Sequence, residues 1–121
     1  MKKKKIDLKR GKFYITYAVG IHPSLIYRKS KKKNRYDAIV FGTTEGKHRT
    51  KLDKPISEGI SVSVIHNKPI RGTRKDFADK NFVGESIDKI DKAKIEFVKR
   101  KEPSETRRYK EYKKTKNKKS T

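Results

Sequence analysis

The chain of 121 residues contains no cysteine, no tryptophan and no long apolar run. The absence of cysteine excludes a disulfide framework and thiolate metal sites, and it is typical of proteins of the reducing cytoplasm, where we expect this one to act. Without a long apolar run we expect no membrane-spanning helix. We also expect no secretory signal, because no apolar segment follows the basic stretch Met1–Lys5.

Acidic residues are scarce too: 14 Asp and Glu face 36 Lys and Arg, which gives a formal net charge of +22. Residues 1–12 carry seven basic side chains and one acid, and residues 99–121 carry eleven basic side chains and three acids. Both ends hold too few apolar groups to offset the entropy of ordering, so we predict two disordered basic arms. Residues 13–98 hold nearly all the Val, Ile and Phe and are predicted to form one small domain.

The middle of the chain has the pattern of short strands followed by one helix. Predicted strands, rich in aromatic and β-branched residues, are Lys12–Val19, Pro23–Arg28, Tyr36–Thr43 and Ile60–Ile65, with Asn67–Arg74 as a turn or short edge segment. A helix is predicted over Ser86–Arg100, with Ile87, Ile90, Ala93 and Phe97 as its apolar face. The fold class we expect is therefore mainly β with one C-terminal helix: a small antiparallel barrel or curled sheet, with the helix packed on it.

The charge indicates a polyanion as partner, and nucleic acid fits best because phosphate neutralisation gives sequence-independent affinity. A membrane surface is not expected, since the arms lack an apolar face to accompany their lysines. We expect RNA ahead of DNA. The predicted contacts lie in three basic loops and comprise Lys31, Lys32, Lys33, Arg35, Lys47, His48, Arg49, Lys51, Arg71, Arg74 and Lys75.

Three histidines, His22, His48 and His66, follow or precede predicted strands. The chain has no HExxH or paired-histidine spacing, no Walker A pattern and no paired carboxylates at a strand end, so we expect no metal and no cofactor. An imidazole beside an arginine can deprotonate a 2′-hydroxyl and stabilise the developing phosphate charge, which is the chemistry of RNA cleavage. The densest cluster is Thr43–Leu52; its alternative interpretation is a solvated hairpin that contacts phosphates without chemistry.

The order of elements resembles that of the MazF/PemK family of toxin endoribonucleases over about residues 11–98. The segments that carry the resemblance are Gly11–Val19, His22–Tyr27, Ala38–Thr44, Ser61–Arg71 and Phe82–Gly84 followed by the helix. It implies an SH3-like barrel, metal-independent RNA cleavage through a cyclic phosphate, a homodimer and a neutralising antitoxin. The family's arginine before proline corresponds to His22 in this sequence, a departure from the family's residue type, and its catalytic hydroxyl corresponds to Thr43 or Thr44.

Three functions are thus open. The first is an endoribonuclease with His22, Thr43 or Thr44, and Arg49 or Arg71 acting on the scissile phosphate. The second is a non-catalytic nucleic-acid-binding accessory protein that uses the same loops and both arms. The third is a structural protein of a ribonucleoprotein or nucleoprotein particle, with the arms threaded into RNA or DNA.

Overall fold

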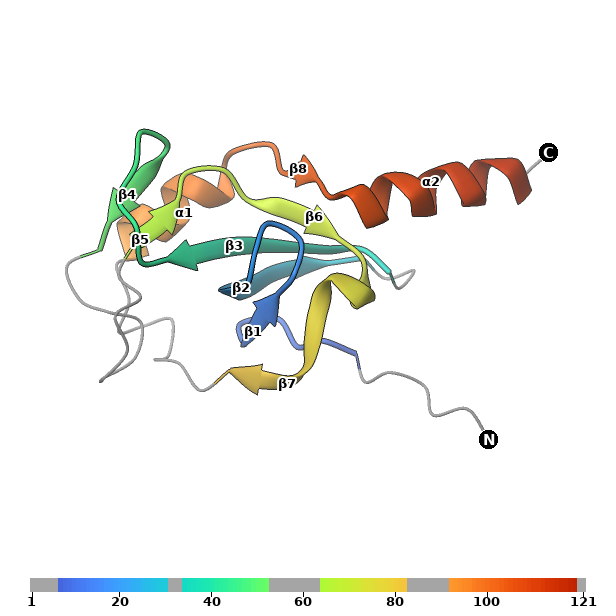
Figure 1. Cartoon of the computed structure of the whole chain (residues 1–121), viewed down its shortest axis with the longest axis horizontal. Helices are drawn as coiled ribbons and strands as arrows, with labels where there is room; N and C mark the ends of the chain where they lie inside the picture. The colour runs from blue at the N-terminus through green and yellow to red at the C-terminus, as the bar shows by residue number, and fades with distance from the viewer. Residues whose placement is uncertain (1–6, 31–33, 53–63, 83–91, 120–121) are drawn as a thin grey trace.

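The central strand of the sheet is β3 (Tyr36–Gly42), all of whose residues are buried. The structure, a computed structural model, describes residues 7–30, 34–52, 64–82 and 92–119, without the side chains of residues 79–82 and 116–119. Its other elements are β1 (Phe13–Thr16), β2 (His22–Lys29), β4 (Arg49–Lys51), β5 (Val64–His66), β6 (Ile70–Gly72), a 3-10 turn (Arg74–Asp76), β7 (Phe77–Phe82), α1 (Lys92–Lys99), β8 (Ser104–Glu105) and α2 (Arg107–Lys119) (Figure 1).

The strands follow the order β4-β5-β3-β2-β1-β7, and neighbours in this order are antiparallel. The two halves of β3 have different partners on its other side: Tyr36–Ala38 pairs with β6, whereas Phe41 and Gly42 pair with β5. Strand β8 adds to β6 in the parallel direction. The expectation of a mainly β fold is confirmed. The expected barrel is not: no pairing among the described strands closes the sheet on itself.

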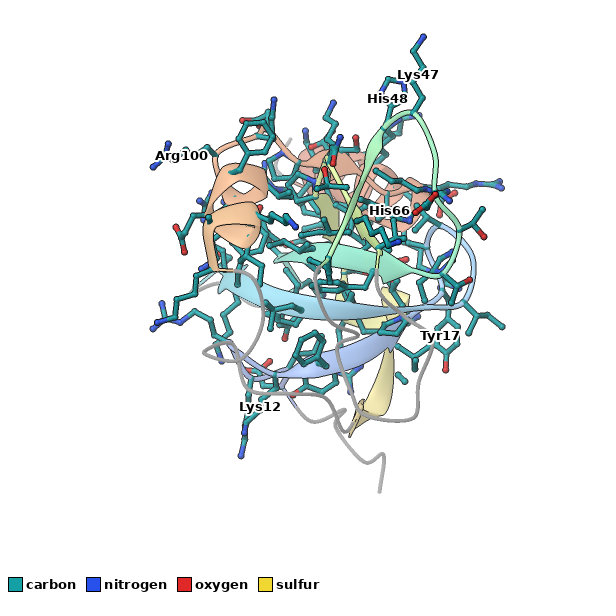
Figure 2. All side chains as sticks on the ribbon, turned by 90° about the vertical axis from the view of Figure 1, so that its left-hand side faces the viewer. Lys12, Tyr17, Lys47, His48, His66 and Arg100 are labelled. Atoms are coloured by element: carbon teal, nitrogen blue, oxygen red, sulfur yellow. The ribbon has the colours of Figure 1, made fainter. Side chains whose placement is uncertain are left out.

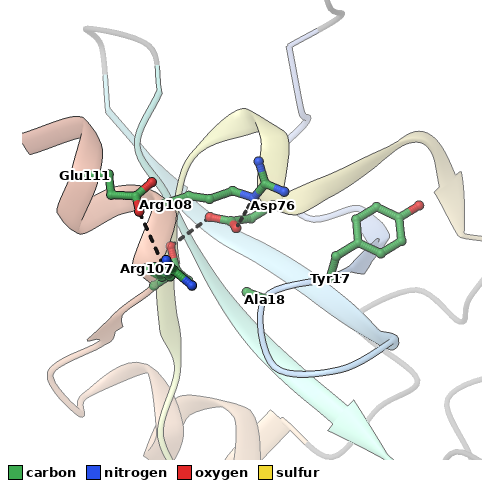
Figure 3. A pocket seen from close by; sticks show the side chains of 7 residues that line it. Tyr17, Ala18, Asp76, Arg107, Arg108 and Glu111 are labelled. Atoms are coloured by element: carbon green, nitrogen blue, oxygen red, sulfur yellow. Dashed lines mark hydrogen bonds and ion pairs between the residues drawn. The ribbon is translucent and has the colours of Figure 1, made fainter. Parts of the chain in front are cut away.

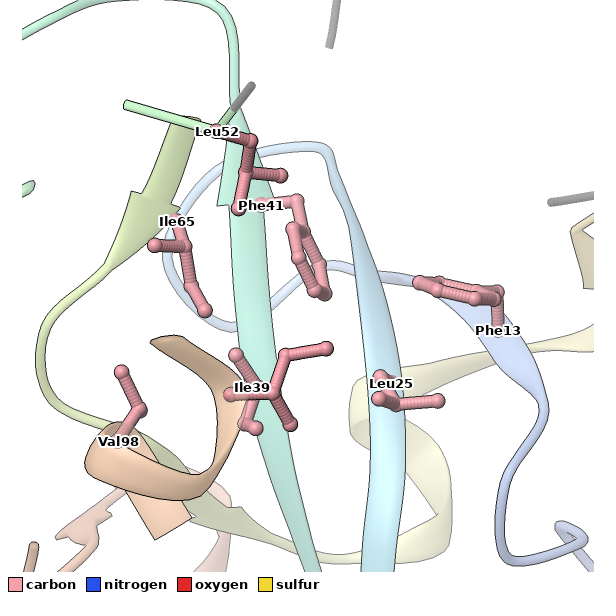
Figure 4. Close-up of a cluster of buried hydrophobic side chains, with 8 residues drawn as sticks. Phe13, Leu25, Ile39, Phe41, Leu52, Ile65 and Val98 are labelled. Carbon is pink, nitrogen blue, oxygen red and sulfur yellow. The ribbon is translucent and has the colours of Figure 1, made fainter. Parts of the chain in front are cut away.

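Successive side chains of each central strand point to opposite faces of the sheet. Both faces are buried, and each carries its own hydrophobic cluster. One cluster contains Phe13, Leu25, Ile39, Phe41, Leu52 and Ile65, and α1 covers it with Ile95 and Val98 (Figure 4). The opposite cluster contains Leu8, Tyr14, Ile26, Tyr36, Ala38, Val40, Ile70 and Phe77. A strand covered on both sides has no reason to carry a polar face, which explains the apolar run Ala38–Phe41 of β3.

The predicted helix is present in its described part, and the prediction that Ala93 and Phe97 belong to its buried face was wrong. Helix α1 spans Lys92–Lys99, and Ile87 and Ile90 lie outside the described residues. The residues buried against the sheet are Ile95 and Val98, whereas Ala93 is exposed and Phe97 leaves 53% of its surface in solvent. The buried face of α1 is therefore rotated about the helix axis relative to the predicted one. It is formed by Ile95 and Val98, which lie three positions apart and contact the first cluster.

Parts of both predicted disordered arms belong to the fold. Leu8 is 1% exposed in the second cluster, and the Gly11 N–H donates to the Ile26 carbonyl at 2.7 Å. Residues 107–119 form helix α2, which Thr106 caps: its Oγ1 accepts from the Tyr109 N–H at 3.1 Å and donates to the Asp76 carboxylate at 2.8 Å. The prediction of disorder was therefore wrong for residues 7–12 and 107–119, and residues 1–6 lie outside the described part.

Candidate nucleic-acid interface and histidine cluster

Three strand ends meet at one end of the sheet and bring two histidines together. His22 is the first residue of β2, and His66 is the last residue of β5. Their rings lie 5.5 Å apart between centroids at an angle of 62°. Gly42, the last residue of β3, lies against both rings, because a Cβ at this position would come within 3.3 Å of His66 Nε2 and 3.7 Å of His22 Nδ1. Because Gly42 has no side chain, both rings have room at this position.

Arg49 completes this group from the neighbouring strand. It opposes His66 in the β4–β5 register, and its Nη1 donates to the Thr44 carbonyl at 3.0 Å. Thr43 and Thr44 are exposed directly after Gly42. The four residues predicted from the sequence as catalytic thus lie at the same end of the sheet, together with a second imidazole. We call His22, Thr43, Thr44, Arg49 and His66 the histidine cluster.

His66 is the electrostatically unusual member of the histidine cluster. Its desolvation, together with the charge of Arg49 and the nearby His22, lowers the pKa of His66 from 6.5 to about 4. Its Nε2 is buried and has no hydrogen-bond partner in the described part of the chain. A neutral imidazole can accept a proton, and a nearby phosphate would raise its basicity because an anion favours the charged form. Since Nε2 is buried, contact with a substrate requires the side chains around it to move.

We expect the stability of the protein to fall between pH 6.5 and pH 4 partly because of His66. Since the unfolded chain binds a proton at His66 over this range and the folded chain does not, acidification favours unfolding. Urea unfolding at several pH values would measure this for the parent and for His66→Gln, which carries no titrating group there. The parent should lose more stability on acidification than the variant does; equal losses would contradict the assigned pKa.

Most of the predicted phosphate-binding residues that the structure describes are exposed to solvent. Lys47, His48, Arg49, Lys51 and Lys75 are exposed, and Lys47 and His48 lie at the tip of the connection before β4 (Figure 2). Arg35 is partly exposed and lies 3.6 Å from Asp37. Lys31, Lys32 and Lys33 lie outside the described residues.

Arg71 and Arg74 differ from the expectation of solvent-facing phosphate contacts. Arg71 is 15% exposed, and its Nε donates to Asp37 at 2.9 Å, a hydrogen bond that raises the pKa of Arg71. Arg74 is 6% exposed, and its Nη1 donates to the Phe77 carbonyl at 3.1 Å. Both guanidiniums therefore stabilise the fold around β6 and the turn that follows it, because they satisfy buried acceptors.

His66 was noticed in the sequence as one of three histidines but was not among the predicted site residues. Its partner Arg49 lies opposite it only through the β4–β5 register, and the chain between these strands includes residues 53–63, which are outside the described part. The basic residues of α2 were also missed as an ordered surface, because their composition indicates disorder. A signal was present in Thr106, an N-cap residue before a run of good helix formers.

Other chemistry finds little support among the described residues. They contain no group of three or more His, Asp or Glu side chains placed to hold a metal ion. Their helices are all too short or too polar to cross a membrane. Comparison with family models, with curated proteins and with solved structures found no match to this chain. The resemblance to the MazF/PemK family therefore stays a prediction from sequence order.

Proposed function

We propose that the protein binds nucleic acid, RNA ahead of DNA, through the phosphate backbone. The observation that carries this proposal is the state of the acidic residues. All the carboxylates with a described side chain lie within 4.0 Å of a lysine or arginine nitrogen: Asp7, Asp37, Glu45, Asp76, Glu96, Glu102, Glu105 and Glu111.

Each acid with a described side chain thus already has a cationic partner, and lysines and arginines outnumber acids in the described part of the chain. Helix α2 shows the excess best, with eight lysines and arginines against the single acid Glu111 over about 20 Å of helix. A surface of this kind attracts polyanions and releases their counterions on binding.

Fluorescence polarisation of labelled single-stranded RNA, single-stranded DNA and duplexes, titrated between about 0.05 and 0.2 M salt, tests the proposal. Backbone binding predicts a linear fall of the logarithm of affinity with the logarithm of salt concentration. Affinity that is absent at low salt, or that does not change with salt, would overturn the proposal. The ratio between the RNA and DNA constants decides the order of preference.

A second candidate function, metal-independent RNA cleavage, is favoured by the juxtaposition of His22 and His66 beside Arg49. In this reaction one imidazole accepts the proton of the ribose 2′-hydroxyl, whose oxygen attacks phosphorus. The bond between phosphorus and O5′ breaks, the second imidazole in its protonated form gives a proton to O5′, and a 2′,3′-cyclic phosphate remains. Arg49 is placed to stabilise the added negative charge on the phosphate oxygens.

We expect the parent protein to cleave RNA but not DNA in the presence of EDTA. His22→Ala and His66→Ala should each lower the rate by about 10²- to 10⁴-fold, the usual contribution of a general acid or base. His48→Ala, measured at saturating RNA because His48 is a predicted phosphate contact, is the control for the chemical step, since His48 is exposed at the loop tip outside the pair of rings. Cleavage that is equal in all variants would indicate a contaminating nuclease. Binding without cleavage by the parent would exclude catalysis and leave the accessory or particle-forming roles.

The homodimer, the antitoxin and the cytoplasmic location are part of the same proposal. The first two rest on the resemblance to the toxin family, and the last rests on the absence of cysteine.

A further inference from the structure

A groove lies between the end of β1 and the first turns of α2, and none of the individually predicted site residues lines it. It has a volume of about 440 Å³, in the range of small-ligand sites, and its lining includes Tyr17, Ala18, Asp76, Arg107, Arg108 and Glu111 (Figure 3). Its two walls come from opposite ends of the chain. We call it the α2 groove.

Asp76 fixes both walls of the α2 groove. Its backbone carbonyl accepts from the Tyr17 N–H at 2.8 Å and from Thr16 Oγ1 at 3.0 Å. Its carboxylate accepts from the Thr73 N–H at 2.9 Å and from Thr106 Oγ1 at 2.8 Å, and it lies 3.4 Å from Arg108 Nε. Because Asp76 is 2% exposed and fully engaged, its charge does not face the groove as a free anion.

The groups that remain open in the groove are an aromatic ring and a guanidinium. Tyr17 leaves 53% of its surface exposed although it follows a buried strand. The Arg107 side chain is 92% exposed. Its contact with Glu111, at 3.3 Å, uses only the Nε–H, which is one of the five N–H donors of the guanidinium. An aromatic face that stacks on a base, beside an arginine that binds phosphate, is the combination found in proteins that bind single strands.

The surroundings extend the groove in two directions. Beyond Arg108 and Glu111 lies a second cavity of about 280 Å³, which Lys75 and Asn34 also line. In the other direction, Thr16 pairs with His22 of the histidine cluster in the β1–β2 register, and Tyr17 is the residue after Thr16. The α2 groove therefore has Lys75 in the cavity next to it, and the strand that leads to Tyr17 pairs with the strand that begins at His22.

We propose that the α2 groove binds one nucleotide of a single-stranded nucleic acid, with the base stacked on Tyr17 and its phosphate at Arg107. This inference rests on the proposed function and specifies the form of nucleic acid: in a duplex both faces of each base are already stacked, so Tyr17 selects an unpaired strand.

The test uses the absence of tryptophan from the chain. Tyr17→Trp introduces a single indole in the groove, and Phe97→Trp is the matched control, because Phe97 on α1 is also 53% exposed and is not among the residues that line the groove. Each variant is titrated with single-stranded RNA, single-stranded DNA and duplex while polarisation reports total binding. We expect quenching of Tyr17→Trp by single strands only, and little change in Phe97→Trp.

Tyr17→Ala should weaken single-strand binding about 5- to 150-fold, the effect of losing one base–aromatic stack, whereas Tyr17→Phe and Phe97→Ala should bind nearly as the parent does. Circular dichroism checks that each variant is folded. Binding by polarisation with equal fluorescence responses in the two Trp variants would overturn the groove and leave the proposed function standing. Binding of duplex with the same Tyr17→Trp quenching would overturn single-strand selection. No binding of any nucleic acid would overturn both proposals.

Discussion

Replacing Lys110, Lys114, Lys116 and Lys118 with glutamine should lower the affinity for single-stranded RNA by two to three orders of magnitude at about 0.1 M salt. Each lysine that neutralises a phosphate on a single strand contributes about 0.7 to the slope of log affinity against log salt, so four lost contacts make that slope shallower by about 3. Lys110 and Lys114 are exposed on α2 and have no carboxylate partner in the described part of the chain. Salt titration of binding measures both quantities.

Glutamine has a helix propensity close to that of lysine, so the substitutions should leave α2 in place, which circular dichroism can verify. The matched control replaces the same four lysines with arginine, which keeps the charge and should keep the slope. An unchanged slope in the glutamine variant would mean that α2 does not contact phosphates. The binding surface would then lie in the loops that carry Lys47 and Lys75.

Asp37→Ala should destabilise the fold by about 3–5 kcal/mol, a large share of the total stability of a small domain. Asp37 is fully buried in β3 and lies 2.9 Å from Arg71, 3.6 Å from Arg28 and 3.6 Å from Arg35. Without its carboxylate, the three guanidiniums would repel one another, and Arg71 would be left as a buried cation without its principal acceptor. Urea unfolding measures the change in the free energy of unfolding.

Glu45→Ala removes the same kind of ion pair from the surface, and it should cost less than about 1 kcal/mol. Glu45 lies 3.7 Å from Lys51, and both side chains are more than 70% exposed. Equal effects of the two substitutions would contradict a structural role for the Asp37 cluster. A stabilising effect of Asp37→Ala would do the same.

Local patterns predicted β2 and β3 closely because their information lies within a few residues, whereas β4, β7 and β8 were not expected as strands. Strand β3 was expected over Tyr36–Thr43 and ends one residue earlier, and β2 was expected from Pro23 and begins at His22. The candidate residues His22, Thr43, Thr44 and Arg49 were found because histidines and hydroxyls at strand ends are visible in sequence. Their proximity follows from antiparallel pairing, in which the start of β2 lies beside the end of β3.

The features that sequence reasoning missed all depend on partners far along the chain. Leu8 looks like an isolated apolar residue in a basic arm, and only the second core cluster shows its role. Arg71 and Arg74 have the appearance of a solvated basic loop, but the acceptor of Arg71 is on β3, 34 residues earlier. Helix α2 depends on a hydrogen bond between Thr106 and Asp76, which are 30 residues apart. Composition alone cannot indicate such pairs.

The attachment of α2 at Asp76 has a consequence for the thermodynamics of association. A lysine-rich segment without structure loses much of its backbone freedom when it docks, and this loss subtracts from its gross electrostatic gain. Helix α2 is instead formed before binding and fixed at its first turn, so the ordering cost has been met during folding. The phosphate contacts that we propose for α2 would therefore contribute more of their energy to affinity than those of an unfolded arm of equal charge.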